Sequence, residues 1–461
     1  MVSTRASSVR PTTSSVVRPT LADVASFDDD YDIRTFSPAL GEGSTADEPR
    51  ADEASAAWAQ AASLGFHEGE LPPLAAGLET LRGVDDGRVL TGVYAKQQRP
   101  GSLDAEGWPV ATFVTLTKSI NVGGGALLDA HLISGVTVQP THRRRGVLRR
   151  MMTDDLTAAK ASGLAVAALT ASEGGIYRRF GFGVATRERA VEVDVRRASG
   201  LVVEPEGTVE LVPRSALAEV APVVFAAFHR RSPGSIDRHE GAWNRLLGRR
   251  RPDGSPDLAV RAAVHRDAAG EIDGYVTYKL EPGGAEHVHV LVVVDLVAAS
   301  DDAYLGLWQL LLAVDLVTTI RYDSAPQSDP LPHVLPDPRA VRITGDQDHV
   351  WLRVLDPIAA LQARPWAADG VVTIAVADAL GLAGGTYRVT SEGGAATVKR
   401  ASVRRADVEL DVATLGSLWL GGVDPVTLAA ADLVRERRRG AVQQLRAMLA
   451  PERPLHGITS F

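Results

Sequence analysis

The stretch Gly135–Met152 reads GVTVQPTHRRRGVLRRMM and combines the end of a strand, a basic turn and the start of a helix. Pro140 breaks the apolar run, and Gly146 allows close approach of the backbone to a ligand. The free N–H groups of a helix that begins after Gly146 favour an anion, and arginines neutralise phosphate well. The segment therefore predicts a pyrophosphate site; a solvated basic turn that caps a helix is the alternative.

The flanking elements favour the ligand site over the solvated turn. Leu127–Val138 has the pattern of an apolar strand, Arg145–Ser162 that of an amphipathic helix, and Leu164–Thr170 that of a buried strand. A strand, a helix and a strand in this order predict a parallel βαβ unit and an α/β fold. Main-chain groups of Val136, Thr137 and Val138 would then be available to the amides of a pantetheine arm.

Composition limits the class of protein. The 461 residues predict two to four domains, and 45% hydrophobic with 23% charged residues is typical of a soluble globular chain. A net charge of −8 argues against broad nucleic-acid binding. The absence of cysteine excludes disulfides and a thiol nucleophile, and no apolar run has transmembrane length. We expect a cytoplasmic protein that binds neither nucleic acid nor a membrane.

Three ordered regions are expected after a disordered tail at residues 1–30, for which a transit peptide is the alternative. The remaining predicted strands are Tyr31–Phe36, Arg88–Lys96, Val110–Ser119, Thr208–Val212, Leu258–His265, Gly274–Leu280, Glu286–Leu296, Trp351–Leu355, Val371–Val376, Gly385–Thr390 and Val408–Val412. The remaining predicted helices are Ala51–Gly65, Ala216–Arg230, Asp237–Gly248, Tyr304–Thr318, Leu415–Trp419, Pro425–Ala431 and Glu436–Leu449.

The basic turn resembles the acetyl-CoA signature of the Gcn5-related N-acetyltransferases (GNAT), Gln/Arg-x-x-Gly-x-Gly/Ala. Leu148 departs from its last position, but the turn Pro140–Gly146 is similar to that of one branch, the enhanced intracellular survival (Eis) proteins of actinobacteria. Four further stretches resemble that branch: Ala171–Gly183, Asp329–His333, Leu415–Gly421 and the terminal Phe461. The resemblance runs from about residue 31 to the end of the chain.

This resemblance implies two acetyltransferase-like domains followed by a sterol-carrier-like domain, assembled as a homohexamer. The expected limits are a GNAT domain that binds acetyl-CoA at 31–187, a GNAT-like domain without cofactor at 188–345 and the sterol-carrier-like domain at 346–461. Because the segment after the last strand of the first domain is shared with the third domain in this branch, these contiguous limits are approximate. The expected contacts of acetyl-CoA are Val136, Thr137, Val138, Arg144, Arg145, Gly146, Val147, Leu148, Arg149, Ser172 and Glu173.

Acyl transfer to an amine needs a base for the nucleophile and an acid for the departing thiolate. The resemblance assigns the acid to Tyr177, which a reference pKa near 10 keeps protonated at neutral pH. It assigns the base to the C-terminal carboxylate of Phe461, although an α-carboxyl pKa of about 3.5 matches an ammonium poorly. By residue pattern alone, Tyr177 could simply pack, Phe461 could fray, and Ser172 and Glu173 could cap a helix.

The predicted activity is direct transfer of acetyl from acetyl-CoA to amines of a polycationic small molecule such as an aminoglycoside. A protein lysine acetyltransferase and a non-catalytic acetyl-CoA or lipid-binding protein are the alternatives. Glu68 and the carboxylates near the N-terminal helix are candidates for an acidic acceptor pocket. No metal is expected, because His142 and His333 lack neighbouring ligands at a metal-binding spacing.

Overall fold

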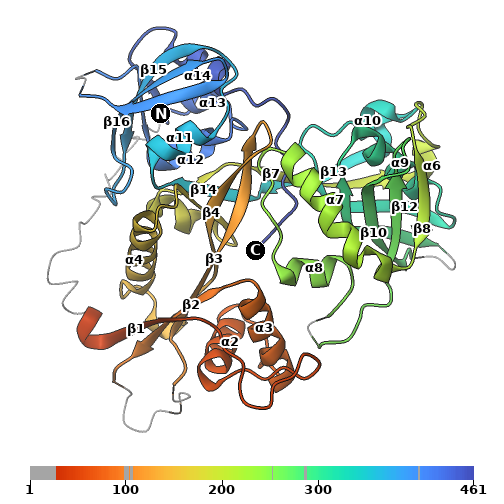
Figure 1. The fold of residues 1–461 in the computed structure, drawn as a ribbon, viewed down its shortest axis with the longest axis horizontal. Helices are drawn as coiled ribbons and strands as arrows, with labels where there is room; N and C mark the ends of the chain where they lie inside the picture. Colours follow the sequence, from red (N-terminus) through yellow and green to blue (C-terminus); the bar gives the residue numbers. More distant parts are fainter. Residues whose placement is uncertain (1–26, 98–102, 104–106, 252, 285–287, 403–404) are drawn as a thin grey trace, which may run out of the picture.

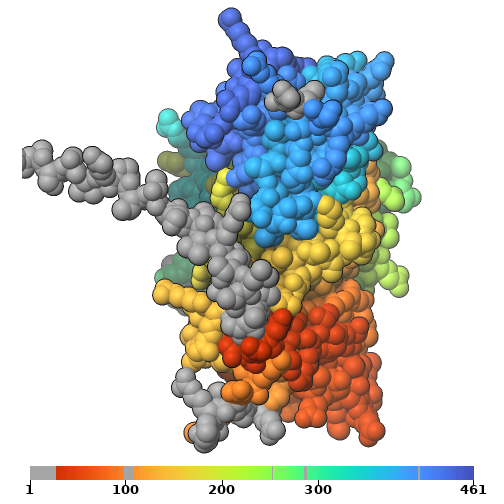
Figure 2. All heavy atoms as spheres, turned by 90° about the vertical axis from the view of Figure 1, so that its left-hand side faces the viewer, coloured from red at the N-terminus to blue at the C-terminus, as the bar shows by residue number. Residues whose placement is uncertain are grey.

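In the described residues of this computed structural model, the chain forms three β-sheets (Figure 1). The structure describes residues 27–97, 103, 107–251, 253–284, 288–402 and 405–461. In the view of Figure 1 the third sheet lies above the first, the second lies beside both, and the C-terminus lies near the centre. The side view in Figure 2 presents the C-terminal region at the top, the gold segment that contains α4 below it and the red N-terminal segment at the bottom.

The first sheet contains the predicted βαβ unit. Its strand order is β1-β2-β3-β4-β5-β14-β6, with β4 parallel to β5. Between them runs α4, which buries Met151, Met152 and Leu156 and so has the one-sided apolar face expected of a helix that covers a sheet. The strands are β1 Tyr31–Phe36, β2 Val89–Ala95, β3 Ala111–Gly123, β4 Ala126–Val138, β5 Val166–Thr170, β6 Gly183–Val184 and β14 Val350–Val354. The helices are α2 Glu53–Gly65, α3 Pro73–Asp85, η1 Pro140–His142, α4 Val147–Ala161, α5 Gly174–Tyr177 and η2 Arg178–Phe180.

The second sheet repeats this arrangement with a parallel pair, β11 and β12, and the strand order β13-β7-β12-β11-β10-β9-β8. Its strands are β7 Arg187–Asp194, β8 Thr208–Val212, β9 Arg261–Arg266, β10 Ile272–Pro282, β11 His289–Ala298, β12 Val317–Ala325 and β13 Val341–Asp348. Its helices are α6 Val195–Ala198, η3 Arg214–Ala216, α7 Leu217–Arg231, α8 Glu240–Leu246, α9 Asp301–Leu312, α10 Leu331–Val334 and η4 Pro338–Ala340.

The third sheet has the order β17-β16-β15-β18-β19 and packs against short helices. Its strands are β15 Gly370–Ala377, β16 Gly385–Glu392, β17 Ala395–Arg400, β18 Val408–Asp411 and β19 Val434–Glu436. Its helices are α11 Pro357–Ala363, α12 Val412–Trp419, α13 Pro425–Ala430 and α14 Ala441–Leu449. The α/β prediction is confirmed by these mixed layers of sheet and helix.

Several predicted elements need correction. The helix predicted at Tyr304–Thr318 is α9, which ends at Leu312; Leu316 then adopts a φ of +62°, and β12 begins at Val317. That left-handed turn carries no glycine or proline, so the local pattern gave no sign of it. The helix predicted at Glu436–Leu449 begins only at Ala441, because Gly440 is left-handed (φ +82°). The sequence also gave no prediction for α3, α11, β12, β13, β17 and β19.

One strand lies in a different sheet from the one expected. The strand predicted at Trp351–Leu355 falls within the expected third domain, 346–461. In the structure it is β14 of the first sheet. It pairs antiparallel with β5 over five residues and with β6 over two. The first sheet is therefore completed by a strand that follows the second sheet in the chain.

Most of the tail predicted to be disordered, residues 1–26, lies outside the described residues. Residues 27–30 are helical, and Phe27 is buried against Tyr31 with ring centroids 5.1 Å apart. Order thus reaches at least four residues before Tyr31, because one aromatic side chain finds a partner at the start of β1.

Candidate functional site

A bulge at Gly135 separates the end of β4 from β5. The two strands pair only from Ala130 to Ile133, and on the other side the register with β3 shifts between Thr112 and Val114. Gly135 has a φ of +59°, and a Cβ there would lie 2.7 Å from the side chain of Val114. A glycine is therefore required, and it releases the four residues that follow Ile133 and precede Val138 from pairing with β5.

The end of β4 presents main-chain groups to this open side. Gln139 donates its N–H to Val110 O at 2.9 Å, so the main-chain groups of Gln139 and Thr137 face β3. By strand alternation those of Val136 and Val138 face the side of β5, where no strand takes them up and only the Arg143 side chain donates to Val138 O, at 3.4 Å, among the described residues. We call residues 135–138 the unpaired β4 edge. It has the donors and acceptors that the predicted contacts with an extended amide-containing ligand require.

The N-terminus of α4 is uncapped and electropositive. Gly146 holds the N-cap position at φ +80° without a side-chain cap, and the space around it is open. In the described part of the chain Arg144, Arg145 and Arg149 are exposed and have neither ion-pair nor hydrogen-bond partners. Leu148 is half-buried and Val147 is buried, so they contribute N–H groups instead of side chains. Unsatisfied N–H groups, the helix dipole and three unpaired guanidinium groups together suit a phosphate group.

The corresponding helix of the second sheet has the opposite character. Ser300 caps α9 by accepting the Ala303 N–H at 2.9 Å, and Asp301 and Asp302 occupy its first turn. Their negative charges disfavour an anion at that end. The features that favour phosphate at α4 are therefore missing at α9.

Tyr177 ends α5, the short helix that follows β5. Burial, and next the negative charge of Glu173, raise the pKa of Tyr177 above its ordinary value of 10.0. Its ring packs edge-on against Phe182 at 6.3 Å, and its hydroxyl has no hydrogen-bond partner among the described residues. Packing therefore accounts for the ring, while the hydroxyl stays protonated and available to a ligand.

Ser172 and Glu173 lie in the turn between β5 and α5 and are both exposed. Neither caps α5 with its side chain, so the capping alternative is not what the structure has. Gly174 is needed beside them, because a Cβ would lie 2.8 Å from the ring of Trp351 on β14. The strand inserted from far along the chain thus shapes the turn that leads to Tyr177.

The C-terminal residue lies at the same end of β5. Thr170, the last residue of that strand, donates its hydroxyl to the terminal Phe461 O at 2.7 Å across 291 residues of sequence. The preceding Ile458 and Thr459 are buried, so the terminus is held and does not fray. Sequence reasoning missed Thr170; its only sequence signal was its place as the last residue of a buried strand, where α/β folds put ligand contacts.

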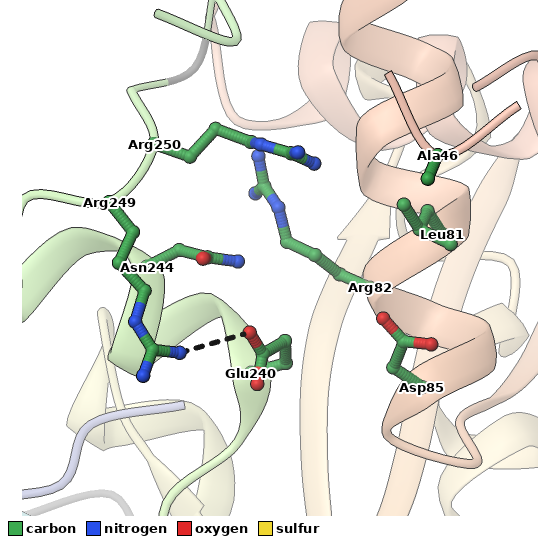
Figure 3. A pocket seen from close by; sticks show the side chains of 8 residues that line it. All are labelled: Ala46, Leu81, Arg82, Asp85, Glu240, Asn244, Arg249 and Arg250. Atoms are coloured by element: carbon green, nitrogen blue, oxygen red, sulfur yellow. Dashed lines mark ion pairs between the residues drawn. The ribbon is translucent and has the colours of Figure 1, made fainter. Parts of the chain in front are cut away.

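A cavity of about 360 Å³ lies between α3 and α8 (Figure 3). Arg82 and Arg250 extend toward each other across it, and Arg249 forms an ion pair with Glu240 at 3.7 Å. Asp85, Asn244, Leu81 and Ala46 complete the lining. Arginines thus accompany the acidic groups here, and Glu68, the residue considered for an acidic acceptor pocket, is exposed and does not line this cavity.

Neither histidine singled out in the sequence belongs to a metal cluster in the described residues, which contain no group of three or more potential ligands. His142 Nδ1 lies 2.9 Å from the hydroxyl of Tyr31, and His333 lies on α10. No helix of the described regions has the length and apolarity needed to cross a bilayer.

Comparison with known protein families supports the division into three parts. Families described as acetyltransferase (GNAT) domain match residues 90–185 and 234–354, and a sterol carrier protein domain matches 358–457. The expected composition of two GNAT domains and a sterol-carrier-like domain is therefore confirmed.

Similar proteins extend over most of the chain. An uncharacterized N-acetyltransferase of Streptomyces avermitilis is 40% identical over 74% of this chain and 83% of its own length. The N-acetyltransferase Eis of Mycobacterium tuberculosis is 33% identical over the same shares. The crystal structure of Eis1 from Mycobacterium abscessus superposes with a TM-score of 0.74 at 29% identity, covering 94% of this chain and all of its own.

A GNAT structure from Anabaena variabilis shares the fold with a TM-score of 0.75 at 16% identity, over 93% of this chain. GNAT enzymes use acetyl-CoA as the acetyl donor, and the uncapped α4 and the unpaired β4 edge provide groups that such a donor needs. The chain therefore belongs to the Eis family of Gcn5-related N-acetyltransferases and is an acetyltransferase.

Proposed function

We propose that this protein transfers the acetyl group of acetyl-CoA directly to an amine of a small polycationic acceptor such as an aminoglycoside. In this proposal Tyr177 is the general acid and the carboxylate of Phe461 is the general base. The single observation that carries it is the 2.7 Å hydrogen bond from Thr170 to Phe461 O, because it brings the chain terminus to the strand end from which α5 and Tyr177 follow.

The donor would lie along the first sheet. Arg144, Arg145 and Arg149 would bind phosphate groups together with the N–H groups of Gly146, Val147 and Leu148. The unpaired β4 edge would bind the amides of the pantetheine arm, and Ser172 and Glu173 would border the thioester. The Ser172 hydroxyl has no base as a hydrogen-bond partner among the described residues, which supports direct transfer without an acetyl-enzyme.

The chemistry follows from the groups at the end of β5. The acceptor amine attacks the thioester carbon, and its excess proton goes to the Phe461 carboxylate, directly or through a water molecule. An N–H of the unpaired β4 edge would stabilise the tetrahedral oxyanion. The C–S bond then breaks, and Tyr177 gives its proton to the CoA thiolate. The raised pKa of Tyr177 supports this role because the hydroxyl is fully protonated at neutral pH.

A direct assay tests the activity. The protein is incubated with acetyl-CoA and, separately, with aminoglycosides, polyamines and lysine peptides, and thiol release is followed. Release with the polycationic small molecules is expected. Release with lysine peptides alone would replace the proposed substrate class by a protein lysine acetyltransferase, and no release with any amine would leave only acetyl-CoA or lipid binding.

A second experiment tests the base. Adding two glycines after Phe461 moves the carboxylate away from Thr170 and is expected to lower kcat about 100-fold, within the range that general bases contribute. Phe461→Leu is the matched control, because it changes the same residue but keeps the carboxylate in place. Full turnover by the extended chain would refute the carboxylate base.

We also propose a homohexamer that acts in the cytoplasm, in line with the Eis resemblance. Light scattering checks the assembly: a particle of six times the 48.8 kDa chain is expected, and a monomeric mass would contradict it.

A further inference from the structure

The last six residues, 456–461, are held mainly by the second sheet and its helices. His456 donates its N–H to Pro233 O at 3.0 Å, and Ile458 packs in the apolar cluster that includes Phe225 and Phe228 of α7. Gly457 passes so close to Gly234 that a Cβ would lie 2.9 Å from its carbonyl oxygen. The path of the terminus is thus set by α7 and by the segment that follows it, Pro233 and Gly234.

His239 contacts this tail one residue before the terminal carboxylate. Its Nε2 lies 3.0 Å from Ser460 O, a group that only accepts, so Nε2 carries the proton and donates. Its Nδ1 accepts the Ala242 N–H at 3.2 Å and so caps α8. The neutral imidazole therefore donates through Nε2 and accepts through Nδ1, and both hydrogen bonds require the same tautomer.

A buried ion pair fixes the backbone beside His239. Arg238 is 2% exposed and donates to both carboxylate oxygens of Asp295 on β11, at 2.6 and 2.7 Å. Its guanidinium also lies over the rings of Phe225 and Trp243, 4.4 and 4.9 Å from their centroids. His239 is consequently attached to the core of the second sheet and has little freedom to shift.

The same segment is joined to the first sheet. Asn121 on β3 accepts the Gly234 N–H at 2.8 Å and donates its own N–H to Ser235 O at 2.9 Å, while Asp237 donates to Ser119 O at 2.9 Å. Residues 234–237 thus continue the hydrogen bonding of β3. This joint sets the distance between His239 and the sheet that carries Thr170 and Tyr177.

We propose that the second GNAT-like domain positions the catalytic C-terminus. His239 is the positioning residue that places the Phe461 carboxylate at the end of β5. This inference rests on the proposed role of that carboxylate as the base. Thr170 of the first sheet donates to Phe461 O, and His239 of the second region donates to the carbonyl oxygen of the preceding residue, Ser460. A flexible α-carboxylate would otherwise sample many positions, and a shift of about 1 Å can cost about 100-fold in rate.

The surroundings keep the ring in the form that this role needs. Burial, and next the Arg88 guanidinium, lower the pKa of His239; Asp86 and Arg245 are the other charged groups that act on it. The neutral ring keeps Nδ1 as an acceptor for the α8 cap while Nε2 donates to Ser460 O. A second histidine, His349, lies with its Nε2 3.3 Å from Ser460 Oγ and is 4% exposed.

Two substitutions separate the two functions of the ring. Asn in His239→Asn can still cap α8 through its side-chain oxygen, but it is too short to reach Ser460 O. Gln in His239→Gln can place its amide N–H near the position of Nε2. We expect His239→Asn to lower kcat 10- to 100-fold with an unchanged KM for acetyl-CoA, on the scale of about 1 Å of misplacement, and His239→Gln to recover most of it.

The pH profile distinguishes lost positioning from general damage. Without a well-placed base the acceptor amine must lose its proton to solvent, so the deficit of His239→Asn should shrink as pH approaches the pKa of the acceptor. Asp424→Ala removes the N-cap of α13, a helix that makes no hydrogen bond to residues 456–461 in the described chain, and is the structural control. An equal loss in this control, or a deficit of the same size at every pH, would overturn the proposal.

The chain extended beyond Phe461 separates this inference from the proposed function. Wild-type kcat in His239→Asn together with an inactive extended chain would refute the positioning role and leave the carboxylate base intact. Full activity of the extended chain would refute the role of the Phe461 carboxylate as the base, and the positioning role of His239 would fall with it.

Discussion

Tyr177 has the surroundings that a proton donor at neutral pH requires. Phe182 packs against its ring, burial raises its pKa, and no described residue takes up its hydroxyl. Packing needs only the ring, and the hydroxyl is not among the fully buried unpartnered polar atoms of the described residues, so it remains accessible to a ligand. The surroundings of Tyr177 therefore support a chemical role for its hydroxyl.

Removing that hydroxyl should affect the chemical step. We expect Tyr177→Phe to lower kcat by about 100-fold or more, in the range that general acids contribute, with little change in the KM for acetyl-CoA. Tyr94→Phe is the matched control. Burial also raises the pKa of Tyr94, but this residue lies on β2 and has no proposed role in the reaction. Equal turnover in Tyr177→Phe and Tyr94→Phe would exclude the acid role.

The pH dependence follows from the raised pKa of Tyr177. The acid acts while protonated, so its contribution to kcat is complete below the folded-state pKa and is lost as pH rises through it. Because burial raises the pKa, the midpoint of this alkaline decline should lie above that of a free tyrosine. Tyr177→Phe should lack the decline; a wild-type decline well below pH 10 would assign it to another group.

At the scale of elements, two helices in equivalent positions have opposite N-termini. The first turn of α4 follows a left-handed glycine and unpaired arginines, whereas that of α9 is capped by Ser300 and followed by two aspartates. The main-chain geometry after a parallel strand is shared, and the side chains decide whether an anion is favoured. The difference between the two helices is therefore encoded locally.

Gly146 offers a test at this scale. Gly146→Ala introduces a Cβ at φ +80°, which costs about 1 kcal/mol and disturbs the turn that presents the N–H groups. We expect the Kd for acetyl-CoA, measured by calorimetry, to rise about five-fold, which corresponds to that free energy.

The other end of α4 provides the control for this test. Gly163 is also left-handed at φ +90°, and the space around it is likewise open. Gly163→Ala should therefore lower stability by a similar amount and leave acetyl-CoA affinity unchanged. The same affinity loss in both variants would mean that the turn before α4 is not the phosphate site.

At the scale of the whole molecule, the third sheet is connected to the short helices that carry Tyr177, the proposed acid. Arg353 of β14 is fully buried, forms an ion pair with Asp378 after β15 at 2.8 Å, and donates a hydrogen bond to Phe180 O at the end of η2. It thereby connects the third sheet to the short helices that carry Tyr177. Gly181 is needed next to it, since a Cβ there would collide with the guanidinium.

Breaking this pair should destabilise the molecule. Asp378→Asn leaves the buried guanidinium without a counter-charge and is expected to lower the free energy of unfolding by about 3 kcal/mol. Asp411→Asn, which affects the exposed pair with Arg178 at 3.1 Å, should change it by less than about 1 kcal/mol. Denaturant unfolding of both variants measures the difference, and equal values would show that burial does not matter here.

Elements with strong local patterns could be predicted closely. β1 has the expected limits, and α4, β4 and β5 differ from expectation by two residues or fewer at each end. Irregular turns were missed because nothing local marks them, as at Leu316, where an ordinary leucine adopts a left-handed conformation. β13 was missed because it is an edge strand whose residues are mostly exposed and whose pairing partner, β7, is distant in sequence.

The sequence by itself determined the βαβ unit, the anion-favouring turn at Gly146 and the family, because each depends on neighbouring residues. Tertiary structure alone decided that β14 completes the first sheet and that the chain terminus reaches Thr170 from 291 residues away. Strand pairing and tail placement depend on which distant surfaces meet, and local periodicity carries no information on that. For the same reason, the contact between His239 and Ser460 could be found only in the folded chain.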